Sequence, residues 1–413
     1  MASAEKKNIK LSKNEIDNLS KSGVEKLHKI EDELNEFFVE REEVIKDAMR
    51  ALIIGQHVFL YGPPGTAKSL LVYELCSRIQ GAKYFQWLLN KTSDPAEIIG
   101  PYSIKAMEQG KFSRKTDGKL PEAHIAFIDE IWKSNEPTLN ILLPLLNEKI
   151  FYNDGKPVEV PLITMFCASN ELPEEDELNA LYDRIIFRDI LDYVKDMENR
   201  VKMHKNYINK RASKSLNKDE EKATISLEEI YALQKRARVI EISEDIYYNF
   251  EKLITALSMR GIVISDRRQN ECLKVLQGNA VYEGRSKVIL EDFESLKYVL
   301  WNKVKDVEQI EEEILRIINP FDDKINDYVR KFREIKNHIE SIYSRDEKCK
   351  ASIEGKVAID TILKKMHMVV KQAKENERST KDMEDKIAYI KKYNVRLAEQ
   401  ALNIDLSSNE DIF

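Results

Sequence analysis

Residues 62–69 read Gly-Pro-Pro-Gly-Thr-Ala-Lys-Ser and directly follow the apolar run Val58–Tyr61. The spacing G-x-x-x-x-G-K-S between a strand and a helical pattern, here residues 70–79, is typical of a phosphate-binding loop. In such a loop, backbone N–H groups converge on phosphate oxygens, and the following helix adds the positive end of its dipole. A simple Gly-Pro turn does not require this spacing. The loop therefore restricts the chain to α/β folds that bind a nucleoside phosphate.

Each residue type in the loop has a physical reason to stand there. Gly62 and Gly65 permit backbone conformations that a side chain would obstruct. Lys68 can reach the β- and γ-phosphates, and the Ser69 hydroxyl can bind Mg²⁺. The remaining residues of the predicted binding loop are Pro63, Pro64, Thr66 and Ala67.

The composition argues against several classes of protein. A chain of 413 residues can hold two or three domains, and its 13 glycines and 11 prolines indicate a helix-rich fold. The net charge of −6 indicates neither a nucleic-acid-binding protein nor an acidic tail. We find no apolar run of about 18 residues and no signal-peptide pattern, so we expect neither membrane insertion nor secretion. Four scattered cysteines fit no metal spacing and predict reduced core residues of a cytoplasmic protein: Cys76, Cys167, Cys272 and Cys349.

Apolar runs predict a parallel sheet around the loop. Beside Val58–Tyr61, the runs Ile125–Ile128 and Leu162–Ala168 are typical of buried parallel strands, and Ile185–Ile190 is a weaker fourth. Helical patterns lie between them, as at residues 138–147. This alternation predicts a doubly wound α/β sheet over about residues 40–190.

Two interruptions of this block are predicted to be inserted hairpins. Residues 100–121 alternate turn residues with short β-like pieces, before the second strand. Residues 151–158 hold Asn153-Asp154-Gly155 between β-like flanks, which is a strong hairpin signal. Because both would project from the nucleotide core, both are candidates for contacting a partner.

The rest of the chain is predicted to be helical. Strand signals stop at about Tyr193, and the lysine-rich residues 205–222 indicate an exposed loop, with DNA binding as the less favoured reading. Beyond Pro320 the chain is charged and periodic, which predicts a helical hairpin or a three-helix appendage. We therefore expect a polar N-terminal lead-in, mobile or helical, at residues 1–24, a nucleotide-binding core at 25–192, an all-α lid at 193–305 and a helical C-terminal appendage at 306–413.

Polar residues follow the second and third strands. Asp129 and Glu130 end the apolar run at residues 125–128. Asp129 can hold Mg²⁺ beside Ser69, and Glu130 can polarise an attacking water, which favours hydrolysis over transfer to another substrate. Asn170 follows the third strand and could orient that water, although it could also be an ordinary turn residue.

Taken together, these motifs resemble those of the AAA+ ATPases of the MoxR family, and among them the RavA-like branch. The resemblance covers residues 25–305, roughly two-thirds of the chain. It is carried in the core by residues 62–69, 129–133, 168–173 and 180–184, and in the predicted lid by residues 264–268, 276–280 and 284–285.

The resemblance implies roles for the core residues. Residues 62–69 match the Walker A loop that binds ATP, Asp129 and Glu130 match the Walker B pair, and Asn170 matches sensor 1. The inserted hairpins match the helix-2 insert and the pre-sensor hairpin of this AAA+ clade.

It also implies roles for two arginines. Arg184 falls where the family has an arginine finger that reaches into the neighbouring subunit, and Arg267 where the lid supplies sensor 2 to its own subunit's nucleotide. Arg268 is the less favoured sensor 2. Loss of an arginine finger typically lowers the rate of related NTPases by about 10³–10⁵. The alternative for both Arg184 and Arg267 is a surface ion pair.

The C-terminal part of the chain departs from the RavA-like pattern. RavA-like proteins can carry a strand-rich module beyond the lid that binds other proteins, whereas residues after Pro320 show only helical periodicity here. The partners of that module are therefore not implied. The family commonly works beside a protein with a von Willebrand factor A domain, and that pairing is implied by resemblance alone.

The leading hypothesis is an ATPase, assembled as a hexameric ring, that remodels or activates a partner protein. One rival is a nucleic-acid motor, for which the first insert supplies Lys111, Arg114, Lys115 and Lys119. A second is a scaffold that uses ATP only to assemble. A small-molecule kinase is a remote third, because Asn170 and the lid arginines would have no role in it.

Overall fold

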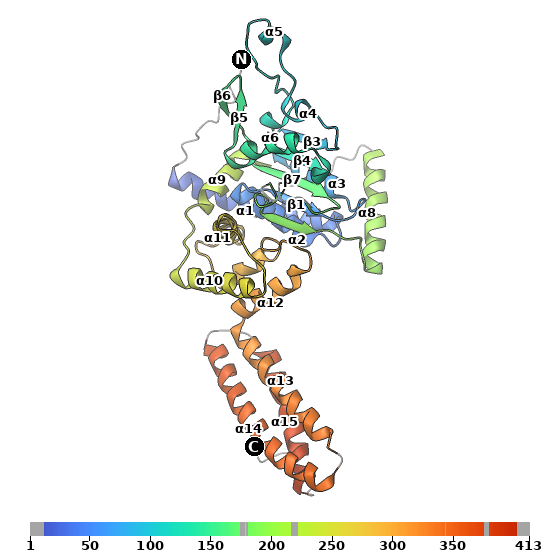
Figure 1. Cartoon of the computed structure of the whole chain (residues 1–413), viewed down its shortest axis with the longest axis vertical. Coiled ribbons are helices and arrows are strands. Elements are labelled where there is room, and N and C mark those ends of the chain that lie inside the picture. Colours follow the sequence, from blue (N-terminus) through green and yellow to red (C-terminus); the bar gives the residue numbers. More distant parts are fainter. Residues whose placement is uncertain are drawn as a thin grey trace. The chain divides into compact units, whose positions relative to one another are not determined.

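The computed structural model describes residues 12–173, 178, 181–215, 222–342, 344–375 and 380–402. The chain divides into two compact units, Met1–Ile314 and Leu315–Phe413, which are drawn in Figure 1. Among the described residues, no helix is both long and apolar enough to cross a membrane.

A five-stranded parallel sheet forms the centre of the first unit. Its strand order is β3-β4-β7-β1-β8, and every neighbouring pair is parallel. This confirms the α/β fold class and the three strands predicted from apolar runs. The strands are β3 (Tyr84–Leu88), β4 (Ile125–Asp129), β7 (Thr164–Ser169), β1 (Val58–Tyr61) and β8 (Phe187–Ile190).

Helices cover the sheet, and their ends follow local capping rules. Ser12 and Glu15 form a capping box at the start of α1 (Lys13–Phe37), so this helix begins inside the segment predicted as a polar lead-in. α2 (Glu42–Ile54) follows after a break, and α3 (Lys68–Cys76) follows β1. Asn135 caps α6 (Glu136–Asn147), as the pattern at residues 138–147 predicted.

Only one of the two inserts is a β-hairpin. β5 (Ile150–Asn153) and β6 (Lys156–Glu159) pair antiparallel around a turn with positive φ at Asp154 and Gly155, which confirms that prediction.

The hairpin predicted at residues 100–121 is wrong. This segment follows the short helix α4 (Pro95–Ile99) and contains α5 (Ile104–Met107) and the 3₁₀ turn η1 (Leu120–Glu122), and a single bridge from Tyr102 to Arg114 is its only described β pairing. Gly110 and Gly118 both turn the chain with positive φ, which interrupts any longer ladder. Figure 1 shows α5 and the β5–β6 hairpin at the same end of the unit.

Two more corrections concern the chain after residue 193. Most of the predicted exposed loop at residues 205–222 is helix, because α8 spans Met197–Ser215, and residues 216–221 lie outside the described part. Strands also do not stop, since β9 (Ile225–Ser226) pairs with β2 (Ile79–Gln80).

Helices then follow β9, and the last of them ends four residues beyond the first unit. These are α9 (Leu227–Ala237), α10 (Glu244–Met259), α11 (Asp266–Tyr282), the 3₁₀ helix η3 (Leu290–Leu296) and α12 (Asp306–Ile318).

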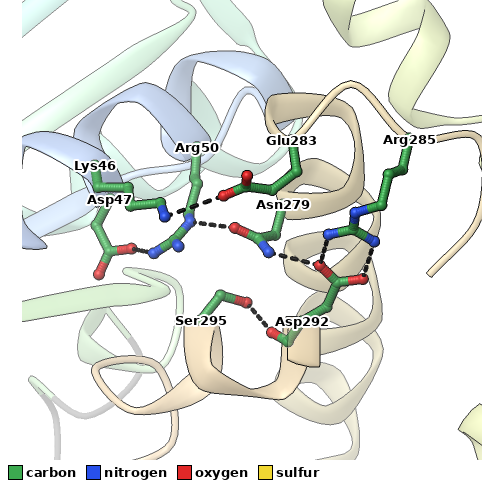
Figure 2. A network of polar contacts seen from close by, with 8 residues as sticks. All are labelled: Lys46, Asp47, Arg50, Asn279, Glu283, Arg285, Asp292 and Ser295. Carbon is green, nitrogen blue, oxygen red and sulfur yellow. Dashed lines mark hydrogen bonds and ion pairs between the residues drawn. The ribbon is translucent and has the colours of Figure 1, made fainter. Parts of the chain in front are cut away.

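A buried polar network joins the core helix α2 to α11 and η3 (Figure 2). Arg50 binds Asp47 and donates through Nε to Asn279 Oδ1 at 2.7 Å. Asn279 Nδ2 in turn donates to Asp292 Oδ1 at 2.6 Å, and Arg285 pairs with the same carboxylate. Arg50, Asn279 and Asp292 are all at most 6% exposed. These contacts therefore pair charged side chains at a buried junction between the core and the lid.

The second unit is a bundle of three helices, one of the two architectures that the periodicity predicted. The helices are α13 (Pro320–Glu340), α14 (Arg345–Glu375) and α15 (Lys381–Leu402). They bury a common apolar core that includes Phe332, Ile359, Met366 and Ile390.

Candidate nucleotide site

Three adjacent strands end at one edge of the sheet, and each is followed by a predicted site residue. The phosphate loop follows β1, Asp129 closes β4, and Asn170 comes directly after β7. Gly62 N–H donates to Ser169 O at 3.1 Å, which ties the start of the loop to the end of β7. The strand order therefore brings the loop, Asp129, Glu130 and Asn170 to one place.

The backbone of the loop is closely held. A Cβ on Gly62 would lie 2.1 Å from the carbonyl oxygen of Leu191, so no side chain fits there. Gly65 and Ala67 both have positive φ, and α3 begins at the next residue, Lys68, with Ser69 following in its first turn. This loop turns backbone N–H groups and a helix N-terminus toward the same space.

Lys68 lies over this loop. Its Nζ donates to the carbonyls of Gly62 at 2.7 Å and Pro63 at 3.0 Å. Burial lowers the pKa of Lys68, while the charges of Asp129 and Glu130 oppose that shift. The ammonium group therefore lies within electrostatic reach of both carboxylates, where it can also meet phosphate oxygens.

The two carboxylates differ in their contacts. Burial raises the pKa of Asp129, although the N–H of Glu130 donates to its Oδ1 at 3.0 Å and lowers it. Glu130 has a positive φ of 53°, and its Oε2 is buried, 3.3 Å from Lys133 Nζ. A partly buried carboxylate with raised pKa, within electrostatic reach of Lys68, fits a site for a Mg²⁺–triphosphate group, whose positive ion would favour the charged carboxylate.

Asn170 is exposed at the carboxyl end of β7. The preceding Ser169 is buried, and its Oγ accepts a hydrogen bond from Glu171 N–H at 3.1 Å. This contact shapes the turn, so that the Asn170 side chain remains exposed at the edge of the sheet where the loop also ends.

Arg184 lies at the opposite end of the sheet. It precedes β8, whose first residue, Phe187, pairs with Val58 at the start of β1, whereas the phosphate loop follows Tyr61 at the end of β1. Four residues of parallel strand span about 13 Å. Arg184 and the phosphate loop are thus at opposite ends of two paired strands.

Arg267, at the start of lid helix α11, lies near Arg184. Ser265, the N-cap of α11, donates to the carboxylate of Asp183 at 2.9 Å, which fixes the start of α11 beside Arg184. Burial lowers the pKa of Arg184, and the charge of the exposed Arg267 lowers it further. Arg267, which we predicted to serve its own subunit's nucleotide, thus accompanies Arg184 at the far end of the sheet, and its role remains a prediction.

Arg268 has a structural environment. It is fully buried, and its guanidinium donates to Asn302 Oδ1 at 2.8 Å, to Trp301 O at 3.1 Å and to Val299 O. Asn302 Oδ1 also accepts from Arg188 of β8 at 3.0 Å. Arg268 therefore fastens the lid to the sheet and is not exposed to a nucleotide.

Two residues that we did not predict contact the loop or its surroundings. The Tyr193 hydroxyl donates to Pro64 O at 3.2 Å. Arg41, at the start of α2, donates to Asp192 O at 2.6 Å, and its charge lowers the pKa of Lys68. Neither residue belongs to a motif with fixed spacing, and only the long-range packing of α2 and the segment after β8 brings them to the loop.

Two family models match the sequence. Residues 25–235 match a family model described as the MoxR domain in the MoxR-vWA-beta-propeller ternary systems, and residues 241–314 match an AAA lid domain. The chain belongs to the MoxR family of AAA+ ATPases. The two matches divide the chain between residues 235 and 241, whereas we placed the lid boundary at 192, and the RavA-like branch remains a prediction.

Relatives of this MoxR-family chain include two uncharacterized proteins of Methanocaldococcus jannaschii. MJ0079 is 38% identical over 77% of this chain and 81% of its own length, and MJ0812 is 38% identical over 71% and 76%. A structural protein of Acidianus two-tailed virus is 35% identical over 40% of this chain and 28% of its own. A crystal structure of a putative ATPase from Cytophaga hutchinsonii matches 72% of this chain and 96% of its own, with a TM-score of 0.58 and 21% identity, and thus shares the fold.

Proposed function

We propose that this MoxR-family chain hydrolyses ATP with Mg²⁺ at the interfaces of a ring, with six subunits as the expected number, and uses the cycle to remodel or activate a partner protein. One observation carries the proposal. The phosphate loop and the carboxylates share one edge of the sheet, while Arg184 and Arg267 share the opposite end. A single subunit then offers half of a catalytic centre on each side, and head-to-tail assembly completes it.

Within one subunit, the loop residues hold the triphosphate. The N–H groups of residues 62–69 and the Lys68 ammonium contact phosphate oxygens, and Ser69 and Asp129 hold Mg²⁺, which neutralises charge on the β- and γ-phosphates when bound. Glu130 accepts a proton from the attacking water, and Asn170 orients that water.

The neighbouring subunit contributes positive charge. Arg184 stabilises the charge that develops on the γ-phosphoryl oxygens, and we propose that Arg267 acts on the same nucleotide from the same side. The charge of Arg267 lowers the pKa of Arg184, and this electrostatic interaction between the two arginines supports the assignment. Hydrolysis becomes conditional on assembly.

The two inserts are proposed to contact the partner protein. Phe112 N–H donates to Asp154 Oδ1 at 2.8 Å, and Arg114 N–H donates to Asn153 Oδ1 at 2.7 Å, so the two inserts are hydrogen-bonded to each other. They expose apolar side chains at Tyr102, Ile104, Met107, Phe112, Tyr152 and Val158. An exposed apolar patch of this kind favours a protein contact. The description of the matched family, which names vWA and beta-propeller components, supports a partner with a von Willebrand factor A domain.

A complementation experiment tests the shared site. Lys68→Ala removes the phosphate contact of a subunit but leaves its arginines, whereas Arg184→Ala does the reverse. Each variant alone should lose ATPase activity, with Arg184→Ala losing about 10³–10⁵ in kcat. An equal mixture should regain about a quarter of the wild-type rate, because random pairing forms one complete interface in four.

Controls separate this outcome from damage to the fold. Glu130→Gln should still bind ATP and should not turn it over, whereas Arg238→Ala, at an exposed arginine between α9 and α10, should be fully active. If the mixture stays inactive while both variants assemble, the arginine does not act across an interface. If the wild type assembles with ATP but does not hydrolyse it, the chain is an assembly scaffold.

A further inference from the structure

α8 presents an apolar stripe to solvent. Met197, Val201 and Ile208 are 72%, 43% and 58% exposed, and steps of four and seven residues put them on one face of the helix. The opposite face is held to the core, where Asn206 Nδ2 donates to Glu36 O at 2.6 Å and Asn199 Nδ2 to Glu40 Oε1 at 3.1 Å. The exposed stripe is therefore the face that the fold leaves available.

The stripe is bordered by positive charge. Among the described side chains of α8, the exposed cations include Lys202 and Lys205, whereas Glu198 is the one acid. We call Met197, Val201, Ile208 and these two lysines the α8 face. Its combination of apolar groups and cations fits a surface that is both apolar and acidic.

The lid carries such a surface on α10. Tyr248 and Met259 are 65% and 83% exposed, and Glu244 and Glu251 are exposed on the same helical face, which the exposed Lys252 borders. We call Tyr248, Met259, Glu244 and Glu251 the α10 face. The opposite side of α10 is buried and apolar, and includes Phe250 and Leu253, so the α10 face also lacks a role in packing the lid.

The two faces lie on the two sides that a ring would bring together. α8 begins just after Tyr193, whose hydroxyl binds the phosphate loop at Pro64. α10 leads through Ser265, bound to Asp183, into the arginine side of the unit. Figure 1 shows α8 beside the core and α10 below the core, next to α11 and α12.

We propose that the α8 face of one subunit docks onto the α10 face of the next copy of this chain. The proposal rests on the ring assembly described under the proposed function and names its contact. If Arg184 reaches the phosphate loop of a neighbour, the lid side of one subunit faces the α8 side of that neighbour. Opposite charges then meet around apolar side chains, and a head-to-tail contact of this kind can close into a ring.

Charge reversal on each face tests this contact. Lys202→Glu with Lys205→Glu changes the α8 face, and Glu244→Lys with Glu251→Lys changes the α10 face. Each pair of substitutions should raise the protein concentration needed for assembly by about tenfold or more in sedimentation velocity with ATP and Mg²⁺, because attraction becomes repulsion. All chains in this experiment also carry Glu130→Gln, so that ATP is not consumed during sedimentation.

Rescue gives the decisive result. A chain with both faces reversed should assemble like the parent, since its charges are again complementary. An equal mixture of the two single-face variants should also assemble, because alternating subunits pair every reversed face correctly. A matched control, Lys21→Glu with Lys29→Glu on exposed positions of α1, should leave assembly unchanged.

Other outcomes overturn the proposal in distinguishable ways. If the parent chain assembles and the α8 variant assembles equally well, the proposed contact between the α8 and α10 faces is wrong, although the chain still forms a ring. If the parent never assembles, the ring itself fails. If the α8 variant assembles normally but no longer binds double-stranded DNA or vesicles containing phosphatidylserine, to which the parent binds, the occupant of the α8 face is a polyanion and not a second copy.

Discussion

The network in Figure 2 predicts how strongly the lid is fastened to the core. Asn279→Leu keeps the side-chain size and removes both polar contacts, from Arg50 at 2.7 Å and to Asp292 at 2.6 Å. Each lost bond leaves a buried charged group short of a partner and costs about 1–3 kcal/mol. Two such losses, offset by about 1 kcal/mol from burying the leucine methyl groups, give a net destabilisation of about 3 kcal/mol.

Native-state hydrogen exchange measures this change where it occurs. Peptides from α2 and α11 should exchange about a hundredfold faster in the variant, as 1.4 kcal/mol corresponds to a factor of ten. Helices α13–α15 belong to the other compact unit and should be unaffected, which gives an internal reference. Urea unfolding followed by circular dichroism provides the independent check.

A matched pair in the same figure supplies the control. Lys46 and Glu283 are 3.0 Å apart but are 31% and 39% exposed, so Lys46→Ala should cost less than about 1 kcal/mol. If Asn279→Leu is no more damaging than Lys46→Ala, burial of the network does not stabilise the joint and the reasoning fails.

Three further predictions concern the site and the sheet. Gly62→Ala should abolish ATP binding, measured with a fluorescent analogue, because its Cβ would lie 2.1 Å from Leu191 O, and normal binding would mean that the loop relaxes freely. Burial and then Asp47 raise the pKa of Asp189 well above its ordinary value of 3.8, so the folded chain holds this proton more tightly and its free energy of unfolding falls as the pH rises above about 4. The stability of Asp189→Asn relative to the parent should therefore increase between pH 5 and pH 8. If the urea midpoints of the two proteins differ by the same amount at both pH values, the prediction is contradicted. Arg267→Ala should lower kcat at unchanged assembly and should complement Lys68→Ala in a mixture, whereas failure to complement would return Arg267 to its own subunit's site.

The local sequence pattern was sufficient to predict the central sheet and the phosphate loop. The strands β1, β4 and β7 are buried on both faces, which leaves continuous apolar runs in the sequence. The edge strand β3 was missed because two of its five residues are exposed, and one of these, Gln86, interrupts the apolar run of Tyr84–Leu88. Capping by Asp94 with Pro95 at N1 likewise favours a short helix, α4, directly before the insert that we predicted at residues 100–121.

Long-range packing determined what the sequence could not predict. α8 is rich in lysine and asparagine and resembles a solvated loop, yet Asn199 and Asn206 fasten it to α1 and to the turn that follows it. Likewise, the motifs identified Arg184 and Arg267 as functional candidates, but only the contact between Ser265 and Asp183 reveals that they lie together. Residue types predict chemistry well, whereas the subunit to which a side chain points depends on tertiary structure.

The hydrogen bond between Ser265 and Asp183 also has a consequence for timing. Asp183 immediately precedes Arg184, and Ser265 begins the helix that carries Arg267, so any rotation of α11 pulls on both guanidinium groups at once. If these groups serve an adjacent protomer, then the lid of each protomer regulates its neighbour's turnover more directly than its own. ATP hydrolysis would then be sequential, because turnover in each protomer would depend on the lid position of the protomer beside it.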